Sequence, residues 1–187
     1  MVIGTERLVL RRFRPSDAET LAAYRSDPEV ARYQSWTAPL APESARVIVA
    51  ELAAGDPDRP GWFQYAVERK QDRVHIGDVG VDLHANRRQA EIGFTLAPAY
   101  QHHGYAGEAV RAVLDHLFRV RGLHKVSAEV DARNTASARL LERAGFTREG
   151  LRRSHTWIKG EWTDDLLYGL LADEWLLPGA PVRGSAG

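Results

Sequence analysis

The 187-residue chain contains no cysteine, and this absence excludes several kinds of chemistry. Without thiols the protein can form no disulfide, no thiolate-held metal site and no cysteine nucleophile. A chain without cysteine is typical of a reducing compartment, so we expect this protein to be cytoplasmic. The N-terminus also lacks the apolar core of a signal peptide, and no apolar run approaches the roughly 18 residues of a membrane span, so we expect no membrane partner.

Net charge is absent too, because 25 Lys and Arg residues balance 25 Asp and Glu residues. A neutral chain exerts no general attraction on nucleic acid, which we therefore do not expect as a partner. The length suits one domain with a sizeable core, which we place at residues 1–177. We expect residues 178–187, rich in glycine and proline, to be a disordered tail, and we expect a monomer or a homodimer.

Two familiar nucleotide-binding motifs are missing. The chain has no G-x-x-x-x-G-K-[ST] loop, and no G-x-G-x-x-G follows a strand. Residues 101–109 (QHHGYAGEA) nevertheless place Gly104 and Gly107 between an apolar strand pattern and an amphipathic helix pattern. The N–H groups at a helix start are unpaired and carry roughly half a positive charge, so phosphate oxygens bind there. The sequence therefore predicts a phosphate-binding turn around Gly104.

Hydrophobic periodicity predicts the element order β-α-α-β-β-β-α-β-α-β-β. The predicted strands are residues 7–12, 62–68, 74–83, 90–96, 124–130, 149–158 and 161–170. The predicted helices are residues 16–25, 43–54, the run after Gly104, and 134–145. Ser16 and Glu19 are expected to form a capping box at the first helix. Because strands in series give way to strand–helix alternation, we predict a mixed α/β (α+β) sheet, with strands 90–96 and 124–130 as parallel neighbours.

Several segments, in order along the chain, resemble the GNAT superfamily of acyl-CoA N-acyltransferases, and within it the RimJ/RimL group. They are TERLVLRRFRPSDAE, the strand AEIGFTLAP, the loop QHHGYAGEA in the form Q-x-x-G-x-A, NTASARLLERAGF, and LLYGLLADEW. The resemblance covers Thr5 to Trp175. It implies a GNAT-like fold with the central sheet splayed at the two parallel strands. It also implies an N-acetyltransferase that uses acetyl-CoA as the acyl donor, acts on a primary amine and needs no metal.

By position in these motifs, the resemblance assigns backbone groups to the coenzyme. The loop would hold the pyrophosphate, the strand before it would pair with the pantetheine arm as an added strand does, and one N–H would polarise the thioester carbonyl. The loop residues are Gln101, His102, His103, Gly104, Tyr105 and Ala106, and the strand residues are Phe94, Thr95 and Leu96. We expect the two loop histidines to present backbone and expose their side chains, and no H-x-x-x-H or carboxylate cluster in the sequence indicates a metal site.

The helix after the next strand supplies two further candidates. Asn134 suits a helix N-cap, and the resemblance adds a hydrogen bond to the coenzyme; both roles are compatible. Leu141 stands where many GNAT enzymes carry a tyrosine that protonates the departing CoA thiolate. The resemblance to RimL-like enzymes implies that Ser137 replaces this acid, because a CoA thiol, with a pKa within a few units of neutral, needs only a weak donor. The alternative for Ser137 is an ordinary serine on a helix surface.

A protonated amine cannot attack a thioester, so an enzyme of this kind needs a proton acceptor. Glu91 is the first candidate, because period-2 alternation puts it on the strand face shared by Gly93 and Thr95. A carboxylate with a structural role at the strand edge is the alternative. The other candidate bases are His75, Asp78, Asp82 and His84.

For the acceptor pocket we expect Tyr33, Trp36 and Trp157 as lining residues, although aromatic residues at such positions also serve in cores. His155, with Asp164 or Asp165, is an alternative lining set. The sequence leaves the acceptor open between a protein N-terminal α-amine, which the RimJ/RimL resemblance implies, and a small-molecule amine. Because the donor tyrosine is missing, a non-catalytic acyl-CoA-binding module is the alternative function.

Overall fold

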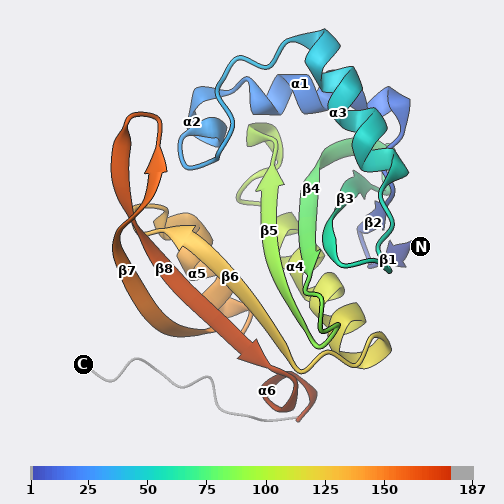
Figure 1. Ribbon diagram of the computed structural model, residues 1–187. Coiled ribbons are helices and arrows are strands. Elements are labelled where there is room, and N and C mark those ends of the chain that lie inside the picture. The colour runs from blue at the N-terminus through green and yellow to red at the C-terminus, as the bar shows by residue number, and fades with distance from the viewer. Residues whose placement is uncertain (1, 178–187) are drawn as a thin grey trace.

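The computed structural model describes residues 2–177, which form one mixed sheet flanked by helices (Figure 1). The expected tail at residues 178–187 lies outside the described residues. The strand order is β1-β2-β3-β4-β5-β6-β8-β7, and every neighbouring pair is antiparallel except β5 and β6. The strands are β1 (Ile3–Gly4), β2 (Leu8–Arg11), β3 (Gly61–Arg69), β4 (Val74–Leu83), β5 (Gln89–Leu96), β6 (Lys125–Asp131), β7 (Thr147–Ile158) and β8 (Glu161–Leu171). The predicted mixed sheet is confirmed.

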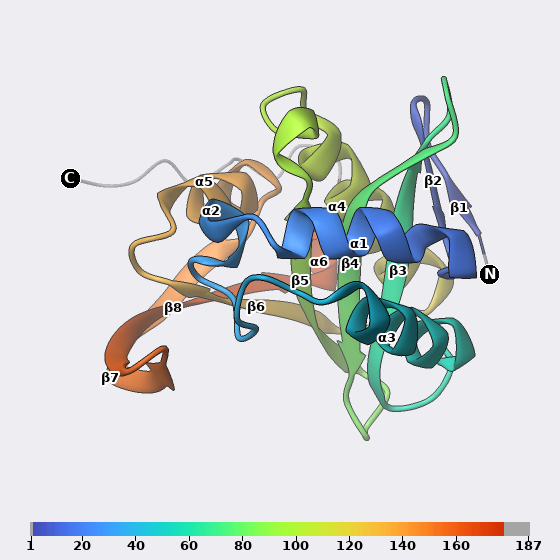
Figure 2. The same cartoon turned by 90° about the horizontal axis from the view of Figure 1, so that it is seen from above.

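Helices cover both faces of this sheet (Figure 2). Helices α1 (Ala18–Arg25) and α3 (Pro42–Ala54) pack on one face, whereas α4 (Tyr105–Asp115) and α5 (Thr135–Arg143) pack on the other. Two further short α-helices, α2 (Pro28–Ala31) and α6 (Ala172–Leu176), were not predicted from the sequence. A 3-10 helix at Pro98–Tyr100 follows β5, and a π-helix at His116–Val120 continues α4.

Strand alternation divides the buried side chains into two cores. On β3, Tyr65 and Val67 belong to the larger core with α4 and α5, whereas Ala66 between them packs with α1 and α3. Fully buried Leu114 and Leu141 fix the two helices of the larger core against the sheet. Each such side chain contributes about 1.5–3 kcal/mol when it leaves water.

The start of the first helix differs from the prediction. Ser16 and Glu19 are exposed, and a 3-10 turn at Pro15–Asp17 precedes α1. The Asp17 carboxylate accepts the N–H of Arg14 at 2.7 Å and a bidentate pair of hydrogen bonds from buried Arg11 at 2.8 and 2.9 Å. The expected capping box is therefore wrong, because the buried guanidinium draws Asp17 inward and makes it the acid that satisfies the turn.

The parallel pair separates after a short stretch of pairing. Residues Gln89–Glu91 of β5 pair with Lys125–Ser127 of β6, and beyond these residues the two strands diverge (Figure 1). Pairing of β5 with β4 continues to Leu96 on the other side. The β6-facing edge of residues 92–96 therefore has no strand partner within the described chain, as the predicted splay requires.

Candidate active site

A cleft of about 600 Å³ lies where β5 and β6 separate. Its walls come from the end of α1, the loop after α2, strands β3 to β6 and the β7–β8 hairpin. The predicted residues that line it are Tyr33, Trp36, Asp78, Glu91, Phe94, Thr95 and Asp165. Two of the three expected acceptor residues, the first candidate base and one residue of the alternative lining set thus lie in one cleft beside the unpaired edge of β5.

Two glycines keep the floor of this cleft open. Gly80 of β4 lies directly opposite Gly93 of β5, between the pairs Asp78–Thr95 and Asp82–Glu91. A Cβ atom at Gly80 would come within 3.0 Å of the Gln64 side chain, so no larger residue fits there without displacing it. Gly80 therefore makes room for the Gln64 and Trp62 side chains, which also line the cleft, whereas the space at Gly93 is open.

Glu91 has the electrostatic surroundings of a base. Its pKa is raised first by burial and then by the negative charges of Glu129 and Asp82. A carboxylate with a raised pKa holds a proton more strongly, so it accepts one from an amine more readily.

Of the other four base candidates, only Asp78 lines the cleft. Asp78 is buried, the Tyr24 hydroxyl donates a hydrogen bond to it, and burial raises its pKa. His75 instead lies in the core, where Phe13 and Tyr24 pack edge-on against its ring and its Nε2 lies 2.8 Å from the Gly77 carbonyl. Burial lowers the His75 pKa, which favours the neutral ring of a structural histidine.

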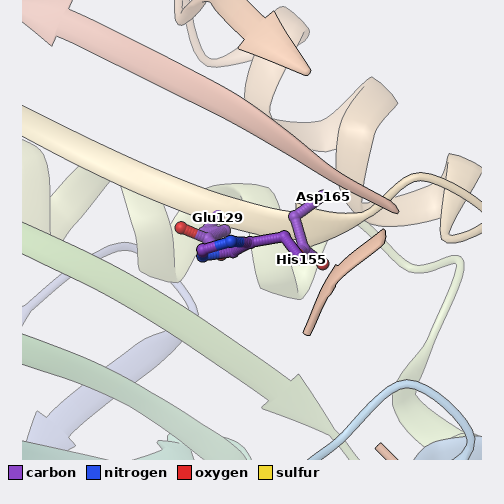
Figure 3. Close-up of side chains that lie close together, drawn as sticks. All are labelled: Glu129, His155 and Asp165. Atoms are coloured by element: carbon purple, nitrogen blue, oxygen red, sulfur yellow. The ribbon is translucent and has the colours of Figure 1, made fainter. Parts of the chain in front are cut away.

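Glu129, which projects from β6 into the cleft, was not predicted from the sequence as a site residue. Figure 3 shows Glu129 beside His155 and Asp165, from three neighbouring strands, and their ligand atoms lie within 4.8 Å of one another. Arg152 supplies a cation to this cluster, 2.9 Å from Glu129 and 3.2 Å from His155 Nε2. The alternation of polar and apolar residues in KVSAEVD was the available signal, because it directs Ser127, Glu129 and Asp131 to one face.

The predicted phosphate loop lies at the end of β5. Gly104 adopts a left-handed conformation (φ +81°) and is the N-cap of α4, and His102 is also left-handed (φ +62°). The Gln101 side-chain amide donates to the Leu96 carbonyl at 3.0 Å, which ties the loop to the end of β5. His102 and His103 are exposed, as expected. This turn at a helix start has the form of an anion-binding site, continuous with the unpaired strand edge.

The predicted N-cap role of Asn134 is confirmed. Its side-chain oxygen accepts the backbone N–H of Ser137 at 3.1 Å. Ser137 is partly buried in the first turn of α5, while Leu141 one turn later is fully buried. Neither Asn134 nor Ser137 lines the cleft, so their roles toward the coenzyme stay predictions.

Trp157 lies outside the cleft lining, whereas its neighbours Thr156 and Ile158 are part of it. Its side chain is 59% exposed and packs edge-on against Trp162 across the β7–β8 hairpin, with ring centroids 5.3 Å apart. At the tip of this hairpin, the Lys159 ammonium donates to the Ala31 carbonyl of α2. The hairpin is thereby joined to the helical side of the cleft.

Comparison with known proteins identifies the family. The family described as acetyltransferase (GNAT) domain matches residues 7–147, which include β5, the loop and α5. The chain belongs to the GNAT acetyltransferase family. It is therefore an N-acetyltransferase, and GNAT acetyltransferases use acetyl-CoA.

Relatives cover nearly the whole chain. The uncharacterised N-acetyltransferase YoaA of Bacillus subtilis is 32% identical over 171 residues, 91% of this chain and 96% of YoaA. The [ribosomal protein uS5]-alanine N-acetyltransferase of Escherichia coli is 24% identical over 182 residues, 92% of each chain. These matches support the RimJ-like character of this GNAT enzyme.

Solved structures show the same fold. A GNAT-family acetyltransferase from Bacillus anthracis superimposes with a TM-score of 0.85 at 28% identity, covering 92% of this chain and 99% of that one. The spermidine N-acetyltransferase of Vibrio cholerae, solved with CoA and spermine, gives a TM-score of 0.79 at 22% identity, covering 92% of this chain and 100% of that one.

None of the helices within residues 2–177 has the length and apolar character that a membrane span requires.

Proposed function

We propose that this N-acetyltransferase moves the acetyl group of acetyl-CoA to a primary amine by direct attack, with both substrates bound together. The observation that carries the proposal is the cleft at the splay, which places Glu91 beside the unpaired edge of β5. The acceptor is a protein N-terminal α-amine or a small-molecule amine. Relatives of both types exist, since one acetylates the alanine of uS5 and another is a spermidine N(1)-acetyltransferase.

The coenzyme fits the strand edge and the loop at its end. Backbone groups of Phe94, Thr95 and Leu96 would pair with the pantetheine arm, and those of residues 101–106 would hold the pyrophosphate. Asn134 would add a hydrogen bond from the α5 side. Bound in this way, acetyl-CoA supplies an acetyl thioester at the inner end of the cleft.

Glu91 accepts the proton of the acceptor ammonium, directly or through water. Its raised pKa suits this task. The free amine then attacks the thioester carbonyl carbon, so that a C–N bond forms and the C–S bond breaks. The electron pair of the broken bond leaves with sulfur, and Ser137 passes to it the proton that makes it a thiol. The attacking nitrogen becomes positively charged as the C–N bond forms, and the proton that it then loses restores the Ser137 hydroxyl.

The acceptor side of the cleft has an aromatic and acidic lining. Tyr33 and Trp36 form one wall, and the Arg25 guanidinium lies over the Trp36 ring, 4.4 Å from its centroid. Trp157 stands on the exposed hairpin next to the lining residue Thr156. We propose that Tyr33 and Trp36 contact the acceptor directly and that Trp157 contacts its more distant part.

A thiol-release assay tests this function. The protein is mixed with acetyl-CoA and a panel of N-terminal peptides, amino acids and polyamines, and free CoA is measured with a thiol reagent. We expect amine-dependent thiol release with at least one class. Tight CoA binding without release by any amine would instead support the non-catalytic acyl-CoA-binding module.

A further inference from the structure

Arg7 joins two segments that are 101 residues apart in the sequence. Its Nε donates to the Glu108 carboxylate at 2.6 Å, and its backbone N–H donates to the other carboxylate oxygen at 2.9 Å. The Thr5 hydroxyl donates to the same carboxylate. Glu108 lies in the first turn of α4, directly after the loop, so the start of β2 is fastened to the start of this helix.

The same guanidinium also holds the loop itself. Its NH1 donates to the His103 carbonyl at 3.1 Å, and its central carbon lies 4.6 Å from the centroid of the Tyr105 ring. A Cβ atom at Gly104 would come within 3.4 Å of its NH2. Arg7 therefore lies against the backbone between His103 and Tyr105.

This contact fixes the direction of one peptide group. In a trans peptide the C=O and the following N–H point to opposite sides. Because Arg7 holds the His103 carbonyl, the Gly104 N–H points away from Arg7, and it has no hydrogen-bond partner within the described chain. The loop is thus held with this donor turned outward, ready for an anion.

Arg7 also offsets a charge that would oppose an anionic ligand. Although partial burial opposes the effect, hydrogen bonds from Thr5 and Arg7 hold the Glu108 pKa below its usual value, so this carboxylate stays ionised. A carboxylate in the first turn stabilises a helix, but it also repels a phosphate bound at the same helix start. The Arg7 cation at 2.6 Å neutralises it.

We propose that Arg7, held by Glu108, is a positioning residue of the coenzyme loop: it orients the His103–Gly104 peptide toward the phosphates and cancels the charge of Glu108. The inference rests on the proposed coenzyme role of residues 101–106. Arg7 acts through the loop backbone and the helix start, from the side opposite the outward N–H.

Calorimetric titration with coenzyme A tests the proposal, because it needs no known acceptor. We expect Arg7→Met to weaken CoA affinity by about tenfold, the range of one charge-assisted hydrogen bond. Arg119→Met is the matched control, since Arg119 pairs with Asp115 at 2.9 Å in the π-helix (His116–Val120) that continues α4 at the end away from the loop. We expect its CoA affinity to stay within twofold of the wild type.

Removing the negative charge of Glu108 distinguishes a positioning role of Arg7 from a general loss of protein stability. In the Arg7→Met background, Glu108→Gln should recover part of the CoA affinity, and added salt should narrow the gap to the wild type, because both remove the repulsion. The CoA affinity of Arg7→Lys, which keeps the positive charge, should lie between those of the wild type and Arg7→Met. Arg7→Lys also tests the proposal if Arg7→Met does not fold. Wild-type CoA affinity in Arg7→Met would overturn the role of Arg7. So would wild-type CoA affinity in both Arg7→Lys and Arg7→Met/Glu108→Gln. A loss of CoA affinity in Arg7→Met that neither salt nor Glu108→Gln alters would overturn it as well. Failure of the wild type to bind CoA would instead overturn the proposed function.

Discussion

At the scale of single residues, Glu91 is the proposed proton acceptor. We expect Glu91→Gln to lower kcat/KM by about 100-fold, in the range of general-base catalysis. Only the ionised carboxylate can accept the proton, so the wild-type rate should fall as pH falls through the raised pKa of Glu91. This acidic limb of the pH–rate profile should be absent in Glu91→Gln.

Asp82 provides a control for the same profile, because it faces Glu91 across β4 and β5 but does not line the cleft. Its negative charge helps to raise the Glu91 pKa. Asp82→Asn should therefore keep most of the activity and shift the acidic limb to lower pH. An unchanged limb in Glu91→Gln would remove Glu91 from the base role.

Ser137 is the proposed acid, and this role is tested by comparing turnover with coenzyme binding. We expect Ser137→Ala to lower kcat about tenfold or more, while the affinity for acetyl-CoA stays unchanged. The cap is preserved in this variant, because Asn134 accepts the backbone N–H of residue 137 rather than its side chain. Exposed Thr135, two residues earlier in the same turn, is the control, and Thr135→Ala should behave as the wild type. Equal kcat values for both variants across pH would contradict the assignment.

At the scale of elements, the loop before α4 depends on backbone that no side chain obstructs. Gly104→Asp should abolish measurable CoA binding, because it strains a left-handed residue and puts a negative charge where the phosphates would lie. Gly122→Asp imposes the same strain at φ +64°, where nothing lies within 4 Å of the added Cβ, and it should bind CoA normally. Normal CoA binding by Gly104→Asp would refute the loop assignment.

Local sequence patterns made most helices and strands predictable, but they did not show to which face of the sheet every side chain points. The limits of β4 follow from the turn residues on either side, Gln71-Asp72 and Ala85-Asn86, and the end of α3 follows from Gly55 and Pro57 after the helix. On β7 the register shifts between Arg152 and Thr156, so simple alternation could not show that Thr156 and Ile158, rather than Trp157, line the cleft. A bulge of this kind changes which face each later residue occupies.

Contacts between distant segments were beyond the sequence pattern. The capping box predicted at the first helix is wrong because Asp17 pairs with buried Arg11, a contact that depends on how β2 packs. Glu129 belongs to a strand that the sequence predicts. Its approach to His155 and Asp165, however, requires β6, β8 and β7 to be adjacent in that order. Site residues that lie within one sequence motif were thus predictable. Site residues that come together only through the order of strands in the sheet were not.

At the scale of the whole molecule, the buried Arg11–Asp17 pair links stability to pH. Although burial opposes it, the hydrogen bonds from Arg11 and Arg14 lower the folded-state pKa of Asp17. The stability that Asp17 contributes is therefore fully present above its unfolded pKa, about 3.9, and is lost as pH falls through the lower folded value. We expect Asp17→Asn to cost about 1.5–3 kcal/mol at neutral pH, because it removes one of the two carboxylates, Asp17 and Glu68, that balance the buried Arg11 cation.

Urea unfolding at pH 7 and at pH values down to 3 measures this effect. The stability of Asp17→Asn should fall less steeply with acid than that of the wild type, because the variant has already lost the titrating group. Exposed Glu19 in the same segment is the control, and Glu19→Gln should change stability by less than about 0.5 kcal/mol. Equal stability of Asp17→Asn and Glu19→Gln at pH 7 would show that the pair does not hold β2 to α1.

Initial-rate kinetics test the central claim, that an amine and acetyl-CoA meet in the cleft between β5 and β6. With the best acceptor from the panel, thiol release and acetylated amine are measured together while both substrates are varied. We predict one thiol for each acetylated amine and intersecting double-reciprocal lines, as direct attack in a ternary complex requires. Parallel lines, or thiol release without acetylated amine, would contradict the account.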